Sequence, residues 1–137
     1  LISIRVGSSG STINQVDFDV SITAIGNGTP VAGSRRINFR LVVRAPASNP
    51  LTAFLTVDSS TPLDNGSGAT IPVSEISWTA RDGEIPSGSY AGTINQLLAS
   101  FTSSVRVTER HSFSYLNQNI YDAGTYNGQV TYTWSAP

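Results

Sequence analysis

The sequence contains no cysteine and no lysine, and it has a single histidine. Without thiols the chain can form no disulfide framework, no thiolate metal site and no cysteine nucleophile. A Ser/His/Asp triad would have to use His111, and neither a G-x-S-x-G motif nor a P-loop spacing is present. We therefore expect a protein that is not an enzyme and that uses no cofactor.

Charged residues are also scarce, at 12% of the chain, and the net charge is −1 at pH 7. This balance predicts no basic patch for nucleic acid or anionic lipid, so we expect no nucleic-acid partner. No run of about 18 apolar residues occurs, which argues against a membrane span. Low charge with many Ser and Thr residues is typical of extracellular proteins. The start at Leu1 rather than Met suggests that a secretory signal has been removed.

The 137 residues fit one domain with a real core. Between turns rich in Gly, Pro and Asn, apolar residues alternate with polar ones, the pattern of half-buried strands. The expected strands cover residues 2–6, 16–24, 37–44, 53–57, 71–80, 105–115 and 130–134. Within residues 71–80, Val73 is out of phase with Ile76 and Trp78, which predicts either a bulge or a strand start near Glu75. Residues 93–101 fit a two-turn helix or a strand with Leu97, Ala99 and Phe101 inward, and the strand is preferred among so many strands. The fold class predicted is all-β, an antiparallel β-sandwich of immunoglobulin-like or jelly-roll type.

Two polar residues interrupt the apolar face of the 105–115 segment. Glu109 and His111 are in phase with the inward positions, where burial is costly unless they are paired. We therefore expect this strand to bend to an edge or rim, where the two residues pair with each other or with Arg. A metal site would need ligands from elsewhere. The polar loop 58–69 does not match EF-hand spacing, so we expect no metal.

The two tryptophans could form a sugar-stacking platform. However, Trp78 is in phase with Ile76, and Trp134 is in phase with Val130 and Tyr132. Core positions are therefore the expected place for both rings.

The N-terminal residues read as a short strand on a tether. Ile2, Ile4 and Val6 alternate with polar residues, and residues 7–12 have the Gly/Ser composition of a flexible linker. A strand attached in this way need not pack on its own domain.

The C-terminal segment 124–133 reads G-T-Y-N-G-Q-V-T-Y-T. It resembles the last strand of bacterial chaperone–usher pilins, including the spore coat protein U-like branch. The resemblance covers about ten to fourteen of the 137 residues. It implies an incomplete immunoglobulin-like sandwich, whose groove is filled by an N-terminal donor strand from a neighbouring subunit. Many such pilins carry a disulfide, which this chain lacks.

The resemblance implies a division into a donor strand with its tether, residues 1–12, and a pilin-like domain, residues 13–137. The donor positions are Leu1, Ile2, Ile4 and Val6. The acceptor groove is formed by Val16, Phe18, Val20, Ile22, Val130, Tyr132 and Trp134. The implied partners are identical or homologous subunits, with a periplasmic chaperone as a further partner.

The residue pattern by itself leads to a similar interpretation. A detached apolar strand at one end complements an unpaired apolar strand at the other, and a head-to-tail contact of this kind generates open filaments. We predict a structural subunit of an extracellular pilus or fimbria, serving adhesion or biofilm formation. The alternative is a monomeric carbohydrate-binding or adhesive β-sandwich module.

Overall fold

The computed structural model describes residues 2–7, by their backbone, and residues 15–136. In these residues the regular elements are β-strands, except for one 3₁₀ turn, η1 (Val73–Glu75). All strand pairs are antiparallel. The predicted all-β, antiparallel sandwich is confirmed.

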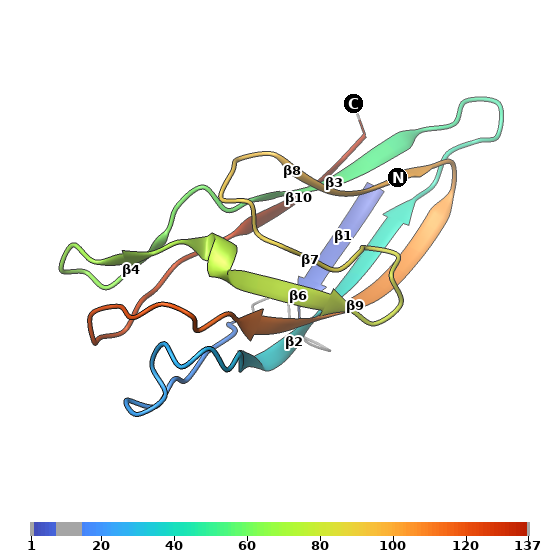
Figure 1. Cartoon of the computed structure of the whole chain (residues 1–137). Helices are drawn as coiled ribbons and strands as arrows, with labels where there is room; N and C mark the ends of the chain where they lie inside the picture. Colours follow the sequence, from blue (N-terminus) through green and yellow to red (C-terminus); the bar gives the residue numbers. More distant parts are fainter. Residues whose placement is uncertain (1, 8–14, 137) are drawn as a thin grey trace.

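Two sheets form the layers of the sandwich (Figure 1). The larger sheet has the order β1 (Ile2–Gly7), β2 (Val31–Val43), β9 (Val105–Tyr115), β6 (Ile76–Ala80), β7 (Gly88–Ser89). The smaller sheet has the order β10 (Thr131–Ser135), β3 (Thr52–Asp58), β8 (Gln96–Thr102). A separate hairpin joins β4 (Leu63–Asp64) and β5 (Thr70–Ile71).

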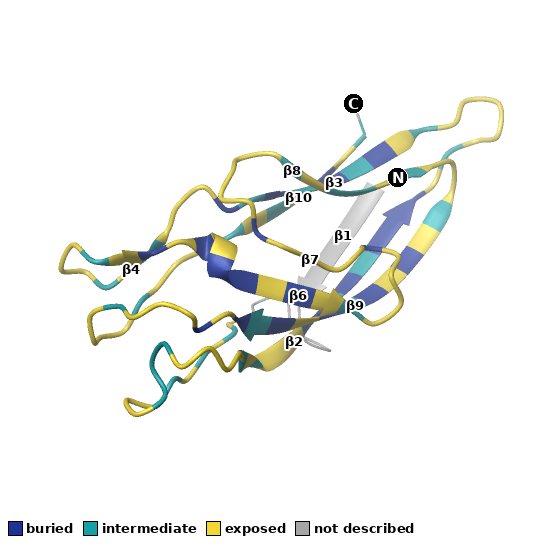
Figure 2. Ribbon diagram, in the orientation of Figure 1, coloured by how far each residue is buried: buried dark blue, intermediate teal, exposed yellow. Residues whose placement is uncertain are grey.

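The core lies between the sheets and follows the period of two along each strand. In β2 the buried residues at this spacing are Ile37, Phe39, Leu41 and Val43, and Val42, on the other face, is also only 6% exposed. Figure 2 shows this alternation of buried and exposed residues along the ribbons. Burial of each such side chain stabilises the fold by about 1.5–3 kcal/mol. Trp78 and Trp134 are both buried, as the sequence predicted.

The strand predicted over residues 16–24 is wrong. Residues 15–20 alternate in burial, with Val16, Phe18 and Val20 half-buried, but they join no sheet and lead into a turn. Their main-chain contact to the larger sheet is at Ser34, whose N–H donates to the Asp17 carbonyl at 2.8 Å. The pairing of β2 with β9 is irregular between Ala32 and Arg36. The apolar face of residues 15–20 therefore packs on the larger sheet beside the irregular stretch of β2, but these residues form no strand pairing of their own.

The strand alternative for residues 93–101 is correct, because β8 covers Gln96–Thr102. The phase predicted for it is wrong at one position. The register with β3 shifts between Leu55 and Thr56, which pair with Ala99 and Leu97. The extra residue, Leu98, packs against the core, and Leu97 is 58% exposed. A β-bulge of this kind changes which residues face inward.

Candidate functional site

The candidate site is the edge of β2 that receives the N-terminal strand. β1 runs antiparallel to β2, with Ile2 opposite Val43 and Gly7 opposite Asn38. β1 is the outer strand of its sheet and hydrogen-bonds to β2 alone. We call this stretch of β2, from Asn38 to Val43, the partner-strand slot. In this chain it is filled by the chain's own N-terminal strand.

The C-terminal strand lies on the opposite layer, under the same half of β2. The Tyr132 ring packs edge-on against Phe39, with ring centres 5.1 Å apart. The Trp134 indole N–H donates to the Val42 carbonyl at 3.2 Å. Cα atoms of β1 and β10 come within 8 Å of one another, and Figure 1 shows β1 between β2 and β10. β10 itself pairs with β3, not with β1.

The hydroxyl of Tyr132 ties this strand to the loop that follows β7. It lies 2.7 Å from the Tyr90 hydroxyl. Burial raises the pKa of Tyr132 well above its ordinary value and raises that of Tyr90 to about 12. Both phenols therefore stay neutral, and the bond between them is a fixed link beneath the slot.

The structure does not gather all predicted groove residues at this slot. Val16 and Phe18 pack at the other end of β2, where a Cβ atom on Gly33 would come within 2.6 Å of Val16. The Phe18 and Tyr115 rings are 6.3 Å apart. Val20 is half-buried against the core, and Ile22 is 83% exposed in the turn that follows.

The remaining predicted site residues are Val130 and those of the donor strand and its tether. Val130 precedes β10 and packs, half-buried, against the core. Of the predicted donor residues Leu1, Ile2, Ile4 and Val6, the last three lie in β1. Leu1, and residues 8–12 of the predicted tether, lie outside the residues that the structure describes.

The expectation that Glu109 and His111 reach a rim is wrong, because both residues are fully buried at the centre of the larger sheet. The Glu109 carboxylate accepts four backbone N–H groups, from Asp82, Glu84, Ile85 and Arg110, at 2.8–3.2 Å. Burial by itself raises the pKa of this carboxyl, but the four donors lower it below its ordinary value. Glu109 therefore holds the loop after β6 in place as a buried anion.

His111, two residues further along β9, contacts the same loop. Its Nε2 lies 2.9 Å from the Ile85 carbonyl, so this nitrogen carries the proton in the neutral ring and donates it. The ring stacks on Trp78 at 5.6 Å. Burial lowers the pKa of His111 despite the nearby Glu109 charge. The pair thus satisfies main-chain groups of this loop, while the His111 Nδ1 is buried without a hydrogen-bond partner.

Other kinds of site find little support in the described part of the chain. Within residues 2–7 and 15–136 no three His, Asp or Glu side chains come together as metal ligands would. Nor does any helix there have the length and apolar character needed to span a bilayer.

Comparison with known proteins assigns neither a family nor a function to the chain. No protein-family model matches the chain, and neither a curated protein nor a solved structure shows a significant match to it.

Proposed function

We propose that the chain is a structural subunit of an extracellular filament, in which β1 of one copy fills the partner-strand slot of the next. The observation that carries the proposal is the position of β1. It is an edge strand whose sheet hydrogen bonds go only to β2, and it lies beside β10. Exchange of an identical strand between copies preserves every main-chain bond of the slot.

The length of the connecting chain permits exchange. Gly7 lies opposite Asn38 of β2, and Asp17 bonds to Ser34, four residues back along the same strand. These points of β2 are about 13 Å apart at the usual rise per residue. The ten peptide units from Gly7 to Asp17 reach up to about 35 Å. The connection is therefore longer than closure within one chain requires, which leaves room for docking on a neighbour.

The direction of exchange supports an open filament. Donor strand and slot are different surfaces, so a copy that gives its β1 still presents an empty slot. Such a heterologous contact continues from copy to copy unless the geometry closes a ring. The monomeric carbohydrate-binding alternative predicts instead that β1 stays on its own chain at every concentration.

A disulfide experiment separates these two possibilities, since the chain has no cysteine of its own. Ser3 and Val42 are register partners, and such Cα pairs lie about 4.5–5.5 Å apart, within disulfide range. One batch of protein carries Ser3→Cys and another carries Val42→Cys. The two are mixed, unfolded, refolded together at high concentration and oxidised. A disulfide between the batches forms only when β1 of one chain fills the slot of another.

The matched control replaces the second partner with Ser34→Cys, which lies on β2 beside Asp17 and away from β1. We expect mixed dimers on non-reducing gels with Val42→Cys and few with Ser34→Cys. A double variant, Ser3→Cys with Val42→Cys, should then give covalent ladders. If the double variant closes only within single chains and the mixture gives no dimers, the filament proposal is wrong.

A further inference from the structure

The arginines are concentrated on one sheet, a feature that the net charge of −1 conceals. Of the eight basic residues, all arginine, six lie within β1, β2 and β9. The other two, Arg44 and Arg81, directly follow β2 and β6. The smaller sheet contains none. The outer face of the larger sheet is therefore the basic side of the molecule.

The strand register places three of these arginines in a zigzag. Positions 106, 108 and 110 of β9 alternate with its buried residues and so face outward, as do positions 38, 40 and 42 of β2. Arg40 pairs with Thr108, between Arg106 and Arg110. Diagonal neighbours of this kind are about 7–8 Å apart. On the far side of β2, Arg40 has Arg5 of β1 as its register partner.

Carboxylates are nearly absent from this sheet. Its five strands contain one, Glu109, and that side chain is buried on the core face and bonded to the loop after β6. Arg81 is paired with Asp82 at 2.9 Å. No carboxylate of the described residues lies within ion-pair distance of Arg40 or Arg106. Like charges side by side on a sheet are destabilising, so an external anion would relieve this arrangement.

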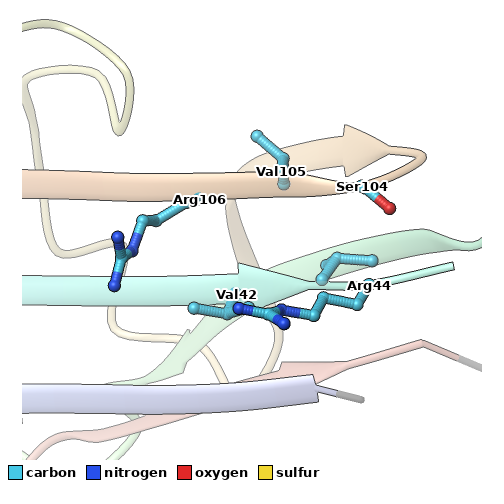
Figure 3. Close-up of a pocket in the computed structure, with 6 residues that line it drawn as sticks. Val42, Arg44, Ser104, Val105 and Arg106 are labelled. Atoms are coloured by element: carbon cyan, nitrogen blue, oxygen red, sulfur yellow. The ribbon is translucent and has the colours of Figure 1, made fainter.

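One end of the zigzag is hollowed. Val42, Val43, Arg44, Ser104, Val105 and Arg106 line a shallow cavity of about 250 Å³. In Figure 3 the Arg106 side chain reaches from β9 toward β2, and the Arg44 side chain runs back beside Val42. The Arg106 guanidinium thus lies over the face of β2 at this end of the zigzag, where a carboxylate could accept from it.

The surroundings favour a charged sugar chain over nucleic acid. Proteins that bind single strands on a sheet stack bases on aromatic rings, and readers of duplex DNA insert a helix or ribbon into a groove. The outward positions of β2, β9 and β6 carry no aromatic residue; the rings of Phe39, Trp78 and Phe113 are buried. Beside the arginines lie hydroxyl groups that can hydrogen-bond to a sugar, those of Thr79, Thr108 and Ser112. Asn38 lies there as well, and its Oδ1 accepts from the Arg110 Nε at 3.0 Å.

We propose that the outer face of β2 and β9 binds a linear acidic polysaccharide, with Arg40, Arg106 and Arg110 contacting carboxylates of its uronic acid units. All three residues belong to one chain and lie on strands that do not exchange. The inference therefore stands whether or not β1 docks on a neighbour.

The test measures binding of the full-length chain to polygalacturonate by titration calorimetry near physiological salt. The double variant Arg40→Ser, Arg106→Ser removes two charges from the zigzag. The matched control, Arg35→Ser with Arg36→Ser, removes two charges from the irregular start of β2. We expect about a tenfold or greater loss of affinity for the first, because charge-assisted hydrogen bonds are lost, and less than about threefold for the control.

Duplex DNA of equal total charge and neutral dextran are titrated alongside. Wild-type protein should bind polygalacturonate more tightly than either. Equal losses from the two double variants would show unspecific attraction to charge and overturn the inference. Tighter binding of DNA, or no binding of polygalacturonate by the wild-type chain, would overturn it as well.

Discussion

At the scale of single residues, Glu109 is the polar group on which the fold depends most directly. A carboxylate can accept all four of its N–H donors, whereas the amide of Gln offers one acceptor oxygen and turns its own N–H₂ toward donors. Glu109→Gln should lower the free energy of unfolding by about 2–4 kcal/mol, because buried donors are left unpaired.

Urea denaturation measures this loss. Glu84→Gln is the matched control, because it makes the same chemical change on an exposed side chain of the same loop. It should shift the unfolding free energy by less than about 0.5 kcal/mol. Equal effects of the two substitutions would mean that the Glu109 charge does not hold the loop.

His111 predicts a pH dependence that belongs to one side chain, since the chain has no other histidine. Burial lowers the pKa of His111 in the folded state below the ordinary value of 6.5. As the pH falls below about 6.5, the unfolded chain takes up a proton that the folded chain resists, so stability is present above this pH and is lost below it. Further acidification adds the loss from Glu109, whose pKa is also lowered.

The measurement is the unfolding free energy between about pH 7.5 and 5.5, the range in which an ordinary histidine titrates. His111→Gln keeps a side-chain N–H for the Ile85 carbonyl and cannot titrate. The variant should be less stable than the wild type at neutral pH, and its stability should change little over this range. A variant that retains the wild-type slope would assign the pH dependence to another group.

At the scale of elements, the bulge in β8 leads to a prediction about Leu97 and Leu98. Strict alternation of inward and outward residues would give the opposite one. Leu98 packs against the core, and Leu97 is 58% exposed. Leu98→Ala should therefore lower the unfolding free energy by about 1–3 kcal/mol, and Leu97→Ala by less than about 0.5 kcal/mol. Each serves as the other's control in the same denaturation series. A larger loss at Leu97 would place the bulge elsewhere.

These strands also show how far the sequence predicts the fold. Alternation identified β2, β3, β6, β9 and β10, because each has a regular partner and one buried face. It failed for residues 16–24, where alternation produces a packed face beside an irregular stretch of β2 but no ladder. It also misplaced β9 at a rim, because three of the four main-chain donors that satisfy Glu109 come from a loop about 25 residues away in the chain. No local pattern records such a contact.

The pairing of β1 with β2 gives a second prediction at this scale. Ile4 is the register partner of the fully buried Leu41, and Ser3 is the partner of Val42 on the outer face. Register partners share a face of the sheet, so Ile4→Asp should place a carboxylate against the core at a cost of at least a few kcal/mol. Ser3→Asp should weaken docking of the strand far less. Chemical denaturation and the yield of multimers both measure the difference.

Comparable losses from the two substitutions would contradict a docked strand with this register. If neither substitution has an effect, β1 contributes nothing to the stability of the fold or to the joining of copies. The monomeric carbohydrate-binding alternative would then be favoured over the filament.

At the scale of the whole molecule, closure within one chain and exchange between chains use the same strand and the same slot. The free-energy difference between them then comes mainly from the connecting chain and from concentration, since the docked contacts are alike. A dilute sample should favour closed monomers, and refolding from a concentrated unfolded sample should favour joined copies.

Deletion of residues 1–6 therefore separates the ability to donate a strand from the ability to accept one. The shortened chain retains β2 and β10, so its slot can still accept a strand, but it has none to donate. Refolded alone at high concentration, it should give no ladder of multimers by light scattering coupled to size exclusion. Refolded with an equal amount of the intact chain, it should terminate growing chains at their donating ends and shift the ladder toward dimers. Because termination requires a working slot, this outcome distinguishes a capped chain from one that has merely failed to fold. Multimers of the shortened chain as long as those of the intact protein would mean that copies join through some other surface, and β1 would then not be the donor strand.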